Sequence, residues 1–207
     1  MEPQPGAGRN IRVLLWAVIA AAALALGIIL RALWVQFGQT SLVPPEAAGG
    51  IPAGRAIDVL SAWAAGWHLD AGMVSCITSH HKDAAVDEAW TCQVYSSEAQ
   101  SIALVRVTGR GATLLRETAA LYPQTVLPRA AWQTDSTEAL KTWWRHGGRD
   151  AWGERGVVAL HLRLGTGSGD APTWQISVES RGGAEMSFWE ISATSGAVLE
   201  TREARDS

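Results

Sequence analysis

GMVSCI at residues 72–77 and WTCQV at residues 90–94 return 84 residues later, as GVVALH at residues 156–161 and WQISV at residues 174–178. Similarity at one fixed spacing is typical of a chain that is built from repeated structural units. We therefore expect two copies of one fold, in which a feature found in one copy alone is an addition to the shared design.

Each copy begins with a segment whose apolar side chains recur at helical spacing, residues 56–67 in the first copy and 134–148 in the second. Asp135 or Ser136 can cap the second helix, and Gly147-Gly148 can end it. Three runs with the alternation or β-branched content of strands follow each helix. These runs cover residues 73–78, 90–96 and 101–107, and then 157–164, 174–180 and 186–192.

The predicted fold class is α+β: an N-terminal transmembrane helix followed by two tandem units, each with one helix and a three-stranded antiparallel sheet. Each unit is near the size at which a single core is marginally stable, so we expect the two to pack together. The predicted segments are a tether at 36–54, a first unit at 55–120, a linker at 121–133, a second unit at 134–202 and a charged tail at 203–207. Within the linker, Trp132 should pack against the second unit.

Residues 13–30 contain no charged side chain, and the apolar stretch continues through Val35 after Arg31. This length predicts a transmembrane signal-anchor helix at 13–35, with membrane lipid as its partner. Arg9 and Arg12 favour a cytoplasmic N-terminus at residues 1–12. The predicted location is therefore the cytoplasmic membrane, single-pass, with the C-terminal domain outside; a cleaved signal peptide is the alternative.

The second copy contains DSTEAL at residues 135–140, PTWQISV at 172–178 and FWEISATSGAVLETR at 188–202. Together these motifs resemble the PepSY and PepSY-like family, and the resemblance covers residues 134–202. The first copy keeps Trp90 and Gly111-Ala112 and resembles a degenerate unit of the same family. The residues Ile191-Ser192-Ala193 stand where the family usually has an acidic residue, so no role of that group carries over.

The resemblance implies units that pair a helix with an antiparallel sheet. It also implies a noncatalytic module at the cell envelope, since the family is associated with peptidase propeptides and is proposed to restrain peptidases or to sense ligands. The family supplies no catalytic residue.

Cys76 and Cys92 are the two cysteines of the chain. The repeat aligns Cys76 with Leu160 and Cys92 with Ile176, so both thiols should point into the core from neighbouring strands. Because export would place them in an oxidising compartment, we expect a Cys76–Cys92 disulfide; two buried free thiols are the alternative.

His80, His81 and Asp83 are candidate zinc or copper ligands in the predicted loop between the first two strands. The counterpart at residues 165–170 has no comparable set of ligands, which favours a solvated loop instead. Most of the 11 tryptophans have spacings that indicate core packing. Trp144 and Trp152 are the pair most suited to an exposed partner surface.

A net charge of −3 does not favour a nucleic-acid partner. The chain contains no nucleophile elbow, phosphate-binding loop or His-Glu-x-x-His motif, so we expect neither catalysis nor a cofactor. Together with the predicted span, the family resemblance implies the predicted function, a membrane-anchored extracytoplasmic binding or regulatory module, which binds peptides or restrains an envelope peptidase through strand addition at a sheet edge. The alternatives are a scaffold or assembly component of a membrane complex, and a metal-binding envelope protein.

Overall fold

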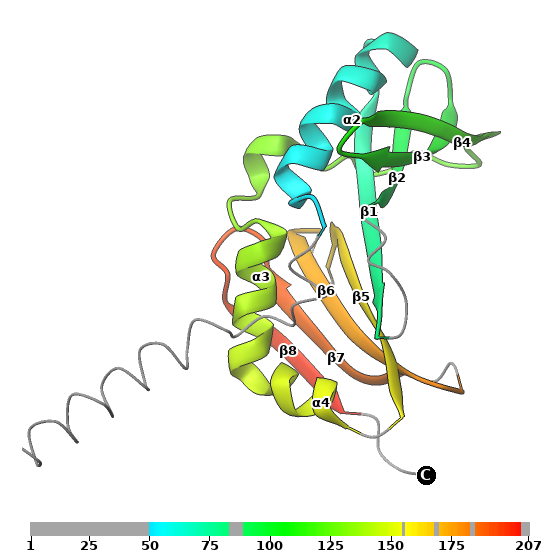
Figure 1. The fold of residues 1–207 in the computed structure, drawn as a ribbon. Helices are drawn as coiled ribbons and strands as arrows, with labels where there is room; N and C mark the ends of the chain where they lie inside the picture. Colours follow the sequence, from blue (N-terminus) through cyan, green and yellow to red (C-terminus); the bar gives the residue numbers. More distant parts are fainter. Residues whose placement is uncertain (1–49, 83–88, 155, 168–169, 183–184, 204–207) are drawn as a thin grey trace, which may run out of the picture. The chain divides into compact units, whose positions relative to one another are not determined.

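Eight antiparallel strands form one sheet in the computed structural model, which describes residues 50–82, 89–154, 156–167, 170–182 and 185–203 (Figure 1). The strand order is β4-β3-β2-β1-β5-β6-β7-β8. The strands are β1 (Gly72–His81), β2 (Trp90–Ser96), β3 (Ser101–Thr108), β4 (Gly111–Ala119), β5 (Val157–Thr166), β6 (Pro172–Ser180), β7 (Glu185–Ser192) and β8 (Val198–Glu203). The helical segments are α2 (Ala53–Trp67), η1 (Arg129–Ala131), α3 (Ser136–Trp143), η2 (Trp144–Gly148) and α4 (Arg149–Gly153).

The prediction of two units, each with its own three-stranded sheet, is wrong. Each copy contributes a helix and a meander of four strands, and antiparallel pairing of β1 with β5 fuses the two meanders into one sheet. The missed strands are β4 and β8, the two edges. In β4 every side chain from Thr113 to Ala119 is exposed, so this strand lacks the alternating apolar pattern by which the other strands were recognised.

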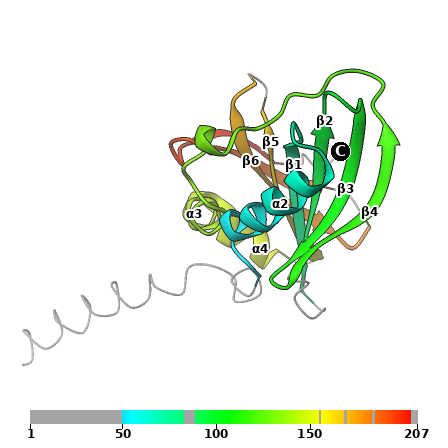
Figure 2. The same cartoon turned by 90° about the horizontal axis from the view of Figure 1, so that it is seen from above.

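The helices lie on one face of the sheet and shield its core (Figures 1 and 2). From α2, Ile57, Leu60 and Ala64 are buried, and from α3, Leu140 and Trp143. Each set follows the 3.6-residue period of an amphipathic helix, so one stripe of each helix meets the sheet. The helical region of the second copy continues past Gly148 into α4, beyond the end that Gly147-Gly148 suggested, because Gly147 turns at a φ of 96° and the chain re-enters a helix.

Trp90 and Trp174 show the repeat most clearly in the structure. Each indole N–H donates to a backbone carbonyl two residues before the helix of its own copy, Trp90 to Ile51 at 2.9 Å and Trp174 to Thr134 at 2.8 Å. The two rings also contact each other edge to face, with centroids 6.2 Å apart. Equivalent residues of the two copies therefore meet at the centre of the core. Trp132 packs on Trp174 with centroids 6.3 Å apart, which confirms the predicted placement of the linker tryptophan.

The carboxylate of Asp135 serves the first turns of both helices. Its Oδ1 atom accepts the Ser136 N–H at 2.6 Å and the Gly54 N–H at 3.1 Å, while the Ser136 hydroxyl accepts the Ala53 N–H at 3.0 Å. Pro52 supplies no side-chain cap to α2, so the second copy satisfies backbone donors of the first. A Cβ on Gly54 would lie 3.1 Å from Asp135 Oδ2, which explains why glycine suits this close approach.

A disulfide joins Cys76 to Cys92, which lie directly opposite each other on β1 and β2, and it confirms the predicted pairing. Both residues are in the core. The alignment of Cys76 with Leu160 is wrong by two residues. Cys76 pairs with Cys92, and Ile176, the counterpart of Cys92, pairs with Leu162. The structural counterpart of Cys76 is therefore Leu162. A shift of two residues keeps a side chain on the same face of a strand, so the inward orientation was still predicted correctly. Such a bond is consistent with an extracytoplasmic protein.

The structure corrects the predicted single-pass membrane location. Among the residues that it describes, no helix has both the length and the apolar character needed to cross a bilayer. The predicted span at 13–35 and the residues up to 49 lie outside the described part of the chain.

Asp70, in the turn between α2 and β1, binds the β2–β3 turn. Its carboxylate accepts the hydroxyls of Ser96 at 2.7 Å and Ser97 at 2.8 Å, and the backbone N–H of Glu98 at 2.9 Å. The hydrogen bond from the Glu98 backbone, with those from the two serines, holds the pKa of Asp70 well below its ordinary value.

We expect the stabilising effect of Asp70 to depend on pH. A lowered folded-state pKa stabilises the fold fully above the unfolded-state pKa of about 4, and this contribution is lost as the pH falls from there through the folded-state pKa. Urea midpoints of the unsubstituted protein should therefore exceed those of Asp70→Asn at pH 7, and the difference should shrink at pH 3. Asp150→Asn, at an exposed aspartate, is the matched control. An equal difference at both pH values would contradict this account.

Candidate binding face

The sheet face opposite the helices carries the side chains that alternate with the core residues. On β1, for example, Cys76 faces the helices and Ile77 faces away. We call this surface the open face. Its central residues are Ser75, Ile77, Thr91, Gln93, Ile102, Leu104, Arg116, Thr118 and Arg163.

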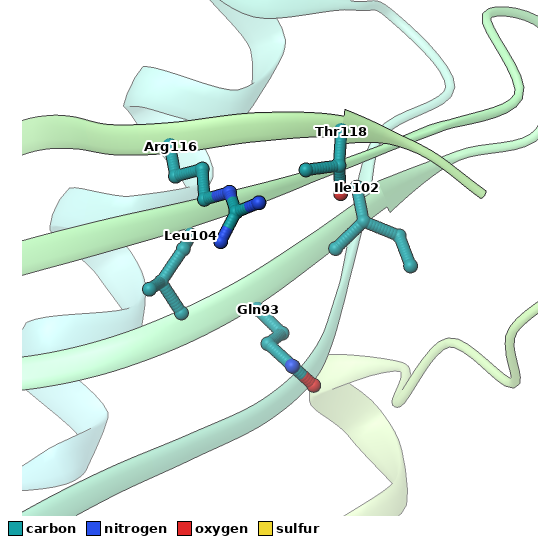
Figure 3. A pocket seen from close by; sticks show the side chains of 5 residues that line it. All are labelled: Gln93, Ile102, Leu104, Arg116 and Thr118. Atoms are coloured by element: carbon teal, nitrogen blue, oxygen red, sulfur yellow. The ribbon is translucent and has the colours of Figure 1, made fainter.

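The described residues of the open face line two hollows. The larger, of ≈ 330 Å³, is lined by Gln93, Ile102, Leu104, Arg116 and Thr118 (Figure 3). The smaller, of ≈ 250 Å³, is lined by Ser75, Ile77, Thr91, Gln93, Leu104 and Arg163. Because Gln93 and Leu104 line both, the hollows form one shallow depression that crosses β4, β3, β2, β1 and β5. With about 4.8 Å between neighbouring strands, it extends about 19 Å across the sheet.

A β-bulge places Arg116 on this face. Val105 of β3 pairs with Leu114, whereas the preceding residue, Leu104, pairs with Arg116, so Leu115 is the extra residue. Without the bulge Arg116 would lie opposite Ala103, whose side chain is fully buried on the helix side. The bulge therefore turns a guanidinium from the core side to the open face, where Figure 3 shows it extending toward Leu104.

Hydrogen-bond donors dominate the depression. The Ser75 hydroxyl donates to Gln93 Oε1 at 3.3 Å, which leaves the Gln93 amide N–H groups available at the centre. Arg163 donates through Nη1 to Gln175 Oε1 at 2.7 Å and retains further donors. The lining of the two hollows contains two arginines and no carboxylate. The depression is therefore electropositive, although the chain has a net charge of −3.

A line of three hydrogen-bonded residues crosses the same face at the β1–β5 seam. The Ser79 hydroxyl lies 2.8 Å from His161 Nδ1, and His161 Nε2 lies 2.6 Å from Glu179 Oε2. These residue types also occur in hydrolytic triads, but here they stand on paired strands whose backbone N–H groups are engaged in the ladder, and neither hollow includes them. We therefore assign this line to stabilising the seam between the two copies.

The predicted metal ligands do not form a common site in the described structure. His80 and His81 belong to β1 rather than to a loop, because the strand extends through His81 along β5. Adjacent strand residues face opposite sides, and indeed His80 is buried while His81 is exposed. Asp83 lies outside the described residues. Within the described ranges, no group of three or more His, Cys, Asp or Glu side chains is placed to hold a metal ion.

The candidate partner surface at Trp144 and Trp152 is partly covered. Both side chains are half-buried and pack against the core. The Trp144 ring contacts Trp143, with centroids 5.7 Å apart, and the ammonium group of Lys82 lies 4.6 Å from the centroid of Trp152. The two tryptophans therefore support the helix layer.

Sequence reasoning missed the residues that line the depression. Their types are ordinary for the exposed side of strands, and they become a site through the pairing of β1 with β5 and the bulge in β4. A signal was present in Arg116 and Arg163, which stand in runs otherwise rich in leucine and threonine. The strand pairings are needed to bring both to one depression.

Comparison with known proteins adds one structural similarity. No family model and no curated protein matches the chain. The chain is similar to the crystal structure of a protein described as a "putative lipoprotein" from Clostridium difficile 630, at 11% sequence identity and a TM-score of 0.45. The alignment covers 71% of this chain and 91% of that one.

Proposed function

We propose that this protein is a noncatalytic binding module that holds a polypeptide partner against its open face. The observation that carries this proposal is the asymmetry of the sheet: helices cover one face, whereas the other presents a continuous depression with donors and apolar side chains. A shallow surface that combines arginines with aliphatic side chains suits an extended chain better than an enclosed small molecule.

Two further observations support the proposal. The resemblance of residues 134–202 to PepSY-like units favours a regulatory binding role, and it makes an envelope peptidase the first partner to test. The disulfide agrees with a partner outside the cytoplasm.

The open face is a better docking surface than either sheet edge. The bulge at Leu115 interrupts the regular backbone groups of the β4 edge, and bulges of this kind hinder strand addition. The β8 edge carries an ion pair in which Arg202 Nε lies 2.6 Å from Glu200 Oε1. Charged side chains on an edge also disfavour the addition of another strand.

Retention of partners on immobilised full-length protein tests the proposal. The Leu104→Asp substitution would put a charge on the apolar floor of the depression and should abolish retention of any partner that uses the open face. Arg145→Asp changes an exposed residue on the helix layer and should leave retention intact. Candidate peptidases in the retained fraction would then be assayed with and without the protein. Equal retention of partners by the unsubstituted protein, Leu104→Asp and Arg145→Asp would contradict the proposal, as would the retention of no partner by any of them.

A further inference from the structure

We propose that the ligand segment is acidic: an extended stretch of about six residues with carboxylates near its two ends, bound across strands β4 to β5. This inference rests on the proposed function and specifies the chemistry of the ligand. The depression is about 19 Å long, and an extended chain advances about 3.3 Å per residue, so about six residues span it.

The two arginines define the ends of this site. Arg116 lines the part of the depression on β4, and Arg163 lines the part on β5. In the described structure Arg116 takes part in no hydrogen bond or ion pair, so its planar guanidinium is available for a carboxylate. Arg163 is already oriented by its bond to Gln175, so less side-chain freedom is lost when it binds.

Residues between the arginines suit a peptide backbone and small apolar side chains. The amide N–H groups of Gln93 can donate to backbone carbonyls near the centre. Ile77, Ile102 and Leu104 provide aliphatic surface beside it. A fatty acid offers one carboxylate for two arginines, and this open depression would leave its apolar chain exposed to water, so a peptide is the better occupant.

Fluorescence anisotropy with synthetic probes tests the inference. The first probe is a fluorescein-labelled hexapeptide, Glu-Val-Thr-Val-Thr-Glu, and the second replaces both glutamates by glutamine. We expect the full-length protein to bind the acidic probe at least about tenfold more tightly, because charge-assisted hydrogen bonds to arginine are lost with the amides. Raising the salt concentration from about 0.05 to about 0.5 M should weaken binding of the acidic probe selectively, because it shortens the Debye screening length from about 14 to about 4 Å.

Arginine substitutions test whether Arg116 and Arg163 bind the acidic probe. Arg116→Gln with Arg163→Gln should lower affinity for the acidic probe by about tenfold or more, whereas Arg145→Gln on the helix layer should change it by less than about twofold. Equal binding of both probes, no binding of the acidic probe, or unchanged affinity of the double variant would overturn the inference. If Leu104→Asp abolishes partner retention while the double variant retains the partner fully, the binding face stands and its acidic specificity is rejected.

Discussion

Replacing Trp174 by alanine is expected to lower the free energy of unfolding by about 3–5 kcal/mol. The side chain is fully buried, contacts the rings of Trp90 and Trp132, and donates its N–H to Thr134. Its removal would leave a cavity where the two copies meet. Since domains of this size are stable by about 5–15 kcal/mol, the loss is a large part of the total, and urea denaturation followed by far-ultraviolet circular dichroism measures it.

Two variants separate packing from hydrogen bonding at this position. Trp174→Phe retains most of the ring but removes the donor to Thr134, so we expect a smaller loss of about 1–2 kcal/mol. Trp63→Ala removes a half-buried ring on α2 and should cost less than Trp174→Ala. If Trp174→Ala were no more destabilising than Trp63→Ala, the assignment of Trp174 to the centre of a shared core would be wrong.

Reduction of the Cys76–Cys92 disulfide is expected to destabilise the protein by about 3 kcal/mol. The bond closes a chain separation of 16 residues and joins two strands of the copy that carries much of the depression. Unfolding of the oxidised and reduced proteins in urea, with thiols counted before and after reduction, provides the measurement.

The variant Cys76→Ala/Cys92→Ala is the control for the effect of the reductant. It should unfold near the midpoint of the reduced protein and should be insensitive to reductant, because it has no bond to break. Identical midpoints for the oxidised and reduced unsubstituted protein would show that the bond does not stabilise the fold.

Local patterns in the sequence predicted much of the fold. Helical periodicity predicted α2 and α3, alternation predicted six of the eight strands, and the repeat predicted that both cysteines face the core. Alternation failed for β4, because every side chain from Thr113 to Ala119 is exposed. It failed also for β8, a short edge strand whose apolar residues Val198 and Leu199 are adjacent rather than at alternate positions. It also failed for the pairing of β1 with β5, because complementary strand edges leave no spacing signal along the chain.

The candidate site was less accessible to sequence reasoning than the fold. The residues that drew attention, His80 and His81, are separated to opposite faces of one strand. The residues that form the depression come from five strands, and Arg116 reaches it through a bulge whose register the sequence does not mark. Such a surface is a product of tertiary pairing, whereas motifs report chemistry that is close together in the chain.

Site-specific photo-crosslinking tests the central claim, that the open face holds the partner. A benzophenone amino acid would replace Gln93 at the centre of the depression in one protein and Lys141 on the helix layer in another, each expressed as the full chain in its native cell. We expect an adduct of defined mass from position 93 and none of that mass from position 141. An adduct from position 141 alone, or from neither position, would contradict the assignment of binding to the open face.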